Sequence, residues 1–511
     1  MNVVTRDDVR ASGLDHWEAI EWRKVNKSAR RLQARIVKAE REGRHGKVQS
    51  LSRILTRSFG GRALAVKRVT ENQGKRTAGV DNVLWSTPAQ KRAAIDALQR
   101  KGYHALPLRR VYIPKANGKR RPLGIPTMKD RAMQALHLLA LAPIAECRAD
   151  TVSYGFRPKR STADAVAQCQ IALARNSGAS WILEGDIKGC FDHISHEWLE
   201  KHIPMDKRIL HQWLNAGYME AGTLHDTSAG TPQGGIISPV LANMTLDGLQ
   251  LALNRRFKRF GHNRGKPVWR GLPTNDPKVN LVRYADDFII TATTQEVLRD
   301  EVLPLVRDFL SERGLTLSEE KTRITHIEEG FDFLGKTMRK FDGKFRAYPA
   351  KKSVQTFLQN VRGIIRLNRA ARPVTLIRQL NPVIRGWAEY HRVHASRNDY
   401  RKVSGAIFTA LWHWAKRRHP KKGVRWIREK YFTTCGRNRW AFFGELREGG
   451  ILRLHQIGRE KVGFYVKINN EVNPFDPAWQ EYLANRVRQG TGRTPRHEAP
   501  HSGRAGTQTD E

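Results

Sequence analysis

The chain has 511 residues, of which 91 are Lys or Arg and 49 are Asp or Glu, so its formal net charge is +42. This length allows several domains, and this charge favours a polyanionic partner, either nucleic acid or an anionic membrane. The four cysteines lie far apart and form no Cys-x-x-Cys pair, which argues against a disulfide scaffold and against a structural zinc site.

The apolar segments argue against the membrane. The longest strongly apolar stretch, 135–145, is much shorter than the roughly 20 residues that span a bilayer. The N-terminal sequence MNVVTRDDVR carries acids where a signal peptide would carry an apolar core. We therefore expect a protein of the reducing cytoplasm, with no membrane partner and no zinc.

The first segment, 1–61, is expected to be a basic helical extension. Apolar residues such as Leu32, Ile36, Leu51 and Leu55 recur with partial helical spacing among many Arg and Lys. A solvated pair of basic helices is the simplest explanation of this pattern. Gly60 and Gly61 are expected to end it.

Residues 62–350 have the composition of a mixed α/β globule. Near its start, 109–121 holds six basic residues and no acid around Ala116-Asn117-Gly118, a turn signal that predicts a hairpin. Such a hairpin could offer cations to a triphosphate or be solvated. Further along, Ser161 and Asp164 have the spacing of a capping box, which predicts a helix start.

Two apolar runs in this region end in acids. The run 181–186 ends at Asp186, and 282–290 places Asp286 and Asp287 between two strand-forming runs, which predicts a hairpin with both acids at its turn. An Asp pair in a turn is often only turn chemistry. Three carboxylates in one sheet, however, can hold two Mg²⁺ ions for phosphoryl transfer. The intervening segment 259–280, rich in Gly and Pro, predicts a connection.

The chain changes character after residue 350. The segment 351–440 has 22 Lys or Arg against three acids, which gives a net charge of +19. Its apolar residues Val354, Leu358, Val361 and Ile365 fall on one helical face, so we expect a helical module with a basic exterior. Segment 441–488 contains short strand-like runs and a helix near its end, and 489–511 has the composition of a disordered tail.

Eight segments, in this order, resemble the sequence blocks of the reverse transcriptases encoded by bacterial group II introns. A single short motif arises by chance, whereas eight in the family's order do not. The N-terminal block, the two fingers blocks and motifs A to E correspond to 66–81, 108–126, 154–165, 181–195, 229–247, 283–288, 314–322 and 331–338. The resemblance implies an α+β right-hand polymerase, with fingers and an antiparallel palm sheet in 62–350 and a helical thumb or maturase domain in 351–440.

The resemblance also implies roles for individual residues. Asp186, Asp286 and Asp287 would be catalytic and would bind two Mg²⁺ ions, for which Mn²⁺ could substitute, with help from the Ile187 carbonyl. Phe191 lies where the family places a bulky side chain against the sugar, which would exclude ribonucleotides. A core aromatic is the alternative.

Further contacts follow from motif position. The residues expected to contact the nucleotide are Lys115, Arg121, Gln233, Gly234 and Lys321, the last as a proton donor to pyrophosphate. The residues expected to contact template or intron RNA are Arg157, Arg160, Arg385, Trp387 and Arg392. Ordinary surface or structural roles are the alternative for each of these residues.

By position after the thumb, 441–488 is expected to bind DNA. The segment 473–482 resembles the lead-in to the HNH endonuclease domain of many relatives, but no Cys pair follows, so we expect no DNA cutting by the protein itself. The expected partners are group II intron RNA, an RNA template, a DNA primer or target, and deoxynucleoside triphosphates. In the bacterial cytoplasm, these partners would place the protein at the nucleoid or in a ribonucleoprotein.

The leading hypothesis is an RNA-directed DNA polymerase that promotes splicing of its intron and supports intron mobility by target-primed reverse transcription. A maturase with an idle polymerase is one alternative, which the complete acid triad disfavours. A reverse transcriptase recruited to host repair or defence, without an intron partner, is another. An RNA-dependent RNA polymerase is disfavoured by Phe191.

Overall fold

The described chain forms two compact units. In the computed structural model, one unit contains the described residues up to 168, residues 183–324 and those from 468, and the other contains 169–182 and 325–467. The structure describes residues 16–488 except 115–117, 119, 232–233, 264–265, 395, 437 and 459–464. The expectations for Lys115, Gln233 and the tail 489–511 therefore lie outside the described residues.

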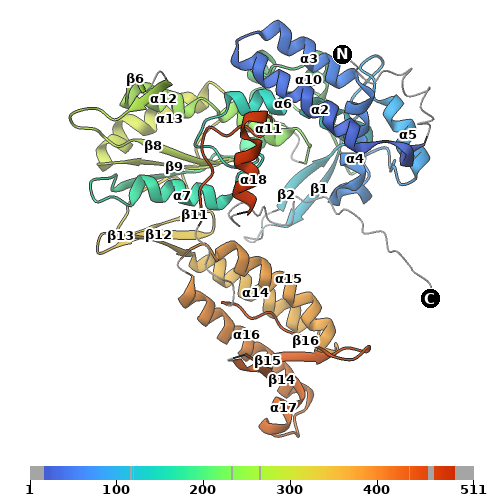
Figure 1. Ribbon diagram of the computed structural model, residues 1–511, viewed down its shortest axis with the longest axis vertical. Coiled ribbons are helices and arrows are strands. Elements are labelled where there is room, and N and C mark those ends of the chain that lie inside the picture. Colours follow the sequence, from blue (N-terminus) through green and yellow to red (C-terminus); the bar gives the residue numbers. More distant parts are fainter. Residues whose placement is uncertain are drawn as a thin grey trace. The chain divides into compact units, whose positions relative to one another are not determined.

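The N-terminal helices of the first unit share a core with a later helix. Buried Leu32, Ile36, Leu51 and Leu55 pack with Ala140 and its neighbours. The elements concerned are α2 (Trp22–Arg41), α3 (His45–Arg57), α4 (Phe59–Glu71) and α6 (Met128–Arg148), with η1 (Trp17–Ala19), η2 (Gln73–Arg76) and α5 (Pro88–Ala97) beside them. Figure 1 shows α2, α4 and α6 together.

The predicted helical extension is present, but its end differs from the prediction. Helix α3 ends before Ser58, whose hydroxyl accepts a hydrogen bond from the Gly61 amide at 3.0 Å and so caps α4. Gly60 and Gly61 thus lie in the first turn of α4 rather than in a break. A boundary at 61 would cut through this helix.

The predicted fingers hairpin is present as two antiparallel strands, β1 (Leu108–Pro114) and β2 (Arg120–Ile125). Their pairing runs from Arg109 opposite Ile125 to Pro114 opposite Arg120. The hairpin belongs to a four-stranded sheet of order β2-β1-β4-β5, completed by β4 (Tyr218–Glu220) and β5 (Thr223–His225).

A second four-stranded sheet, the palm sheet, has the order β10-β3-β9-β8. Both predicted acid-bearing runs belong to it: β3 (Trp181–Gly185) and the antiparallel pair β8 (Asn280–Tyr284) and β9 (Asp287–Ala292), with β10 (Arg323–His326) at one edge. The remaining helices of this region are α7 (Thr162–Leu173), α8 (Cys190–His193), α9 (His196–His202), α10 (Lys207–Leu214), α11 (Ser238–Leu246), α12 (Leu249–Phe257), the π-helix η3 (Val297–Val302) and α13 (Leu303–Ser311). The α+β architecture expected from the sequence is confirmed.

The segment 259–280 is more ordered than predicted. It holds a two-stranded hairpin, β6 (Arg259–Asn263) and β7 (Lys266–Arg270), in addition to connecting loop. Cross-strand contact between Phe260 and Trp269, whose ring centroids are 5.1 Å apart, helps to set its register.

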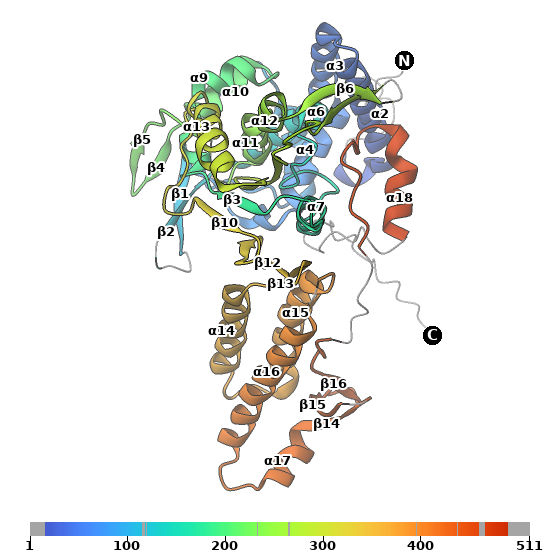
Figure 2. The same cartoon turned by 90° about the vertical axis from the view of Figure 1, so that its left-hand side faces the viewer.

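The second unit contains the predicted basic helical module. Helices α14 (Lys351–Leu367), α15 (Pro373–His391) and α16 (Arg397–Arg418) lie side by side in Figure 2. Val361 and Ile365 are buried in their common core, as the helical spacing predicted. The other elements of this unit are β11 (Phe331–Phe333), β12 (Lys336–Phe341), β13 (Lys344–Pro349), α17 (Val424–Tyr431), β14 (Phe432–Cys435), β15 (Asn438–Glu445) and β16 (Ile451–Arg453).

The segment 441–488 does not form one domain in the described residues. Phe442 and Leu454 are buried in the core of the helical module, which therefore extends beyond residue 440. From residue 468 onward the chain belongs to the first unit instead. There it forms η4 (Pro477–Trp479) and α18 (Gln480–Arg488), where the sequence predicted a helix.

Among the described helices, none combines the length and the apolar character that crossing a bilayer requires.

Candidate active site

A tight hairpin turn between β8 and β9 presents two adjacent acids. Tyr284 pairs with Asp287, so Ala285 and Asp286 form a two-residue turn. Ala285 has a φ of 60°, and a positive φ at only the first turn position is typical of a type II′ turn, which suits the twist of a hairpin. The strands behind the turn are buried, so the turn is anchored at a fixed place on the palm sheet.

Asp186 is brought to the same edge of the sheet by its position directly after β3, the neighbour of β9. A Cβ at Gly185 would lie 2.3 Å from the Phe288 ring, so the absence of a side chain there lets this ring pack against β3. The carboxyl of Asp186 lies close enough to that of Asp287 to raise the pKa of Asp287. The three predicted acids therefore form one group, which we call the acid cluster.

The acid cluster carries more negative charge than its surroundings neutralise. Burial by the surrounding protein, followed by the carboxylates of Asp286 and Asp186, raises the pKa of Asp287 to about 6. Burial also raises the pKa of Asp286. The ammonium of Lys321 donates a hydrogen bond to Asp186 Oδ2 at 2.7 Å, and this bond raises the pKa of Lys321.

The position of Lys321 follows from backbone contacts between motifs A and D. The Ser318 amide donates to the Asp186 carbonyl at 2.8 Å, and the Lys321 amide donates to the Ser318 carbonyl at 3.0 Å. Ile187, which is buried, pairs with Leu317 in an isolated β-bridge. These contacts hold the motif D turn beside the end of β3.

The donor chemistry of the acid cluster fits a hard divalent cation, because its side chains supply only carboxylate oxygens. In the described part of the chain, no three His, Cys, Asp or Glu side chains converge closely enough to hold a metal ion as they stand. Asp186 is instead engaged by Lys321, whose side chain is 64% exposed. A cation could replace this ammonium without unpacking the protein.

Phe191 lies near the acid cluster in sequence and is half-buried rather than part of the core. Its ring meets that of Phe156 edge to face, with centroids 6.3 Å apart. Phe156 is itself 52% exposed. The alternative of an ordinary core aromatic is therefore disfavoured.

The fingers hairpin and the motif B loop approach each other. Gly234 has a φ of 119°, and a Cβ there would lie 2.8 Å from the Gly124 carbonyl in β2, so both its conformation and its surroundings favour glycine. Arg121 is exposed on the same strand, and its charge opposes part of the rise that burial causes in the pKa of Asp286. The fingers therefore supply a cation close to the acid cluster.

Arg157 and Arg160, predicted to contact RNA, are buried instead. The guanidinium of Arg157 binds both carboxylate oxygens of Glu146 at 2.9 Å and donates to two backbone carbonyls. Arg160 donates to the same carboxylate at 3.1 Å. Because these donors are already engaged inside the protein, their placement favours a structural role over RNA contact.

The three predicted RNA contacts of the helical module are placed differently. Arg385 is exposed on α15. Trp387 stacks on Phe357 with ring centroids 4.7 Å apart and packs against the module core. Arg392 is half-buried and forms an ion pair with Glu389 at 3.1 Å. Only Arg385 therefore offers an exposed guanidinium without moving other side chains.

The prediction from sequence missed the residues that fix the turn between β8 and β9. Arg283 is fully buried in β8, forms an ion pair with Asp247 at 2.5 Å and donates to the Ala285 carbonyl at 3.2 Å. A Cβ at Gly155 would lie 2.3 Å from the Ala285 nitrogen, so glycine lets this loop touch the turn. The lone charge of Arg283 within an apolar run is the signal that could have identified it.

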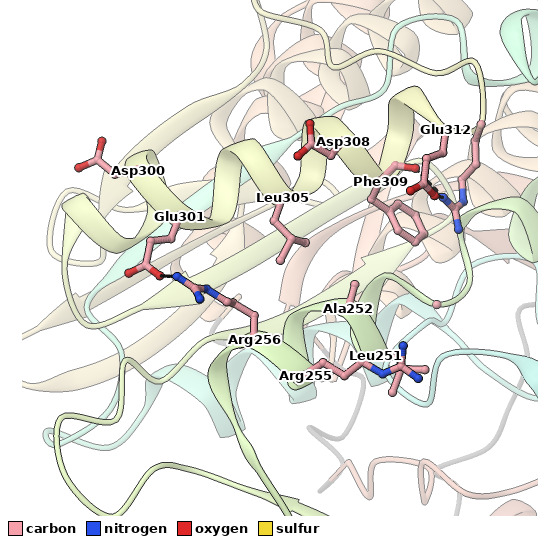
Figure 3. Close-up of a pocket in the computed structure, with 12 residues that line it drawn as sticks. Leu251, Ala252, Arg255, Arg256, Asp300, Glu301, Leu305, Asp308, Phe309 and Glu312 are labelled. Atoms are coloured by element: carbon pink, nitrogen blue, oxygen red, sulfur yellow. Dashed lines mark hydrogen bonds and ion pairs between the residues drawn. The ribbon is translucent and has the colours of Figure 1, made fainter.

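A groove of about 630 Å³ between α12 and α13 is separate from these residues. Figure 3 shows that its charged side chains come from α12 on one side and from η3 and α13 on the other; Arg256 of α12 and Glu301 of η3 form an ion pair at 2.9 Å. None of the predicted site residues lines it.

Three family models match the chain. The model described as "Reverse transcriptase (RNA-dependent DNA polymerase)" matches residues 113–338. The "N-terminal domain of reverse transcriptase" matches 17–98, and the "Group II intron, maturase-specific domain" matches 354–432. These matches cover the acid cluster, the N-terminal helices and the basic helical module respectively.

Curated relatives agree with these matches. The chain is 35% identical over 319 residues to Protein YkfC of Escherichia coli, covering 57% of this chain and 82% of that protein. It is 32% identical over 328 residues to the Group II intron-encoded protein LtrA of Lactococcus lactis, covering 54% of each, so it spans only about half of LtrA. A solved telomerase structure from Candida albicans overlaps 63% of this chain and 64% of its own, with 13% identity and a TM-score of 0.34, a weak likeness.

Proposed function

Because the chain belongs to the reverse transcriptases encoded by group II introns, we propose that Asp186, Asp286 and Asp287 are the catalytic acids of its RNA-directed DNA polymerase. The observation that carries this proposal is the acid cluster itself. Three carboxylates share one edge of the palm sheet, and Lys321 forms an ion pair with one of them, Asp186, at 2.7 Å. Such an arrangement is suited to binding cations and phosphates.

Reverse transcriptases depend on divalent metal ions, and we propose two Mg²⁺ ions for this chain, with Mn²⁺ as a substitute. Asp186, the Ile187 carbonyl, Asp286 and Asp287 would hold them. When bound, such ions lower the pKa of the attacking primer 3′-hydroxyl and neutralise charge on the leaving pyrophosphate.

The chain's own residues would bind and orient the nucleotide. Arg121 would contact the triphosphate, a role supported by the influence of its charge on Asp286, and Lys115 would join it by its position in the fingers block. Phe191 would lie against the sugar, with Gln233 and Gly234 along the nucleotide and template. Lys321, beside Asp186, would hold the proton that pyrophosphate needs on departure.

The maturase-specific domain implies RNA binding, and we propose group II intron RNA as the ligand. The segment 351–440 has a net charge of +19, and charge of this density binds the phosphates of folded RNA largely through shape and backbone contacts. Binding there would promote splicing of the intron and support its mobility by target-primed reverse transcription. Arg385 is the exposed residue of the predicted set.

Primer extension on an RNA template with Mg²⁺ tests the polymerase and its sugar selection. The chain should incorporate deoxynucleotides, and Phe191→Ala should raise ribonucleotide incorporation about 10-fold or more. Phe260→Ala, which changes an equally aromatic but distant exposed residue, is the control. Unchanged discrimination in Phe191→Ala would remove Phe191 from the nucleotide site. Splicing of the parent RNA with and without protein tests the maturase role.

A further inference from the structure

The C-terminal segment 468–488 is joined to the first unit by a buried polar network centred on Asp164, whose side chain is fully buried. One carboxylate oxygen accepts from the Ile468 amide at 2.7 Å and from the Arg486 guanidinium at 2.8 Å. The other accepts from the amide and hydroxyl of Ser161 at 2.9 and 3.0 Å. The predicted capping residue thus also binds the far end of the chain.

Arg160 makes a second set of contacts to this segment. Its guanidinium donates to the carbonyls of Val472 at 3.0 Å and Asn470 at 3.3 Å, in addition to its contact with Glu146. The guanidinium of Arg486 also donates to the Lys159 carbonyl at 3.3 Å. The loop around 157–161 is therefore bonded both to Glu146 of α6 and to the C-terminal segment 468–488.

The same loop supports the catalytic turn. The Tyr154 amide donates to the Arg283 carbonyl at 2.9 Å, and the Arg283 amide donates to the Val152 carbonyl at 3.1 Å. The Tyr154 hydroxyl donates to the Asn470 side-chain oxygen at 3.0 Å. Tyr154 therefore connects two parts of the protein: its backbone bonds to β8, and its side chain bonds to the C-terminal segment. The next residue, Gly155, contacts the turn.

Polar groups that are buried this deeply must keep their partners. Loss of the Arg486 guanidinium would leave the Asp164 carboxylate with fewer donors in a low-dielectric site, a change that costs far more than the loss of a surface ion pair. The loop would rearrange to hydrate the carboxylate, and the strand contacts of Tyr154 would change with it.

We propose that residues 468–488 are a brace of the polymerase, in which Arg486, Asp164 and Asn470 act as positioning residues for the catalytic turn at 284–287. On this view the segment is part of the catalytic body and not an independent DNA-binding domain. The inference rests on the polymerase function proposed above, but its structural part does not need that activity.

The test compares the full-length variants Arg486→Met and Asn485→Ala, the latter changing an exposed neighbour on α18. Hydrogen exchange is measured without substrate, and kcat and KM for deoxynucleotides are measured on a preannealed primer and RNA template. We expect Arg486→Met to speed exchange in 152–157 and 280–292 about 10-fold and to lower kcat about 3- to 10-fold, with KM unchanged. Asn485→Ala should behave like the parent protein.

Two results would overturn the brace. One is faster exchange confined to 465–488 with an unchanged kcat. The other is weaker duplex DNA binding by Arg486→Met with unchanged exchange in 280–292, which would instead support a DNA-binding domain. If Arg486→Met does not fold, Asn470→Ala removes one acceptor of the Tyr154 hydroxyl, which also donates to Gln168 Oε1 at 3.3 Å, and should show the same exchange pattern more weakly. Faster exchange at the turn in a protein without polymerase activity would refute the proposed function and support the brace.

Discussion

Two groups of carboxylates in the first unit have opposite environments. Asp286 and Asp287 lie at the edge of the palm sheet, where burial raises both pKa values and like charge from the neighbouring acids opposes ionisation further. Glu146 and Asp164 lie in the interior, where two arginines bind the Glu146 carboxylate and one arginine and two backbone amides bind that of Asp164. Asp164 lies within a sequence block just as Asp286 and Asp287 do, so membership of a block does not by itself distinguish the two groups.

The difference shows which acids serve stability and which serve a ligand. A buried carboxylate whose hydrogen-bond capacity is filled by the protein has none to offer a substrate. A cluster that retains excess negative charge destabilises the empty protein and gains most from binding a cation. This difference supports the proposal that the acid cluster binds the ligand and that the Glu146 and Asp164 sites stabilise the fold around it.

The largest expected effect comes from removing the acid cluster. The double replacement of Asp286 and Asp287 by Ala should lower kcat in primer extension at least about 1,000-fold, or ~4 kcal/mol, because the cation site is lost. The melting temperature should stay the same or rise, because like charges are removed. Polymerase activity near that of the parent protein would contradict the assignment.

Glu146→Gln should mainly lower the stability of the protein, in contrast to the replacement of the acid cluster, which should mainly lower kcat. It leaves Arg157 and Arg160 without their shared carboxylate, and breaking such a buried pair costs ~3 kcal/mol or more. Urea unfolding measures this loss. The control is Glu319→Gln, which removes a surface pair with Arg307 and should cost less than ~0.5 kcal/mol. An equal decrease in the free energy of unfolding in both variants would show that the buried ion pair contributes no more to stability than the surface pair.

The same comparison explains how far sequence reasoning reached. The two palm runs and their acids were predictable because apolar strands and a short turn leave a local pattern. The burial of Arg157 was not, because its partner Glu146 lies in a different element and ion pairing between elements leaves no periodic signal. The docking of Arg486 on Asp164 joins residues 322 positions apart, a contact that no local pattern predicts.

A third prediction concerns the loop that places the acids. Gly155→Ala should push the turn at Ala285 by about 1 Å and lower kcat about 10- to 100-fold with a smaller change in stability. The control is Gly405→Ala on an exposed part of α16, where a Cβ meets no atom and should stabilise the helix by ~0.5–1 kcal/mol. An unchanged kcat in Gly155→Ala would mean that the turn tolerates displacement.

The smallest effect expected is in the second unit, where Lys336 is a buried charge without the partners that stabilise Arg157. Its described contacts are the Tyr390 carbonyl at 3.1 Å, the Tyr390 ring, whose centroid is 4.3 Å from the ammonium, and His391 Nδ1 at 3.2 Å. Burial lowers the pKa of Lys336 to about 7. An unfolded lysine has a pKa of ~10.4. Between pH 7 and this value the lysine is protonated in the unfolded chain but largely neutral in the folded protein, so the free energy of unfolding rises with pH. The free energy of unfolding should therefore increase by ~2 kcal/mol more from pH 7.5 to 9 in the parent protein than in Lys336→Met. Lys352→Met, which changes an exposed lysine on α14, should keep the parental pH dependence. If the free energy of unfolding depended on pH in the same way in the parent protein and in Lys336→Met, the interior around Lys336 would tolerate a charged ammonium. The contrast between paired and unpaired buried charges would then hold only in the first unit.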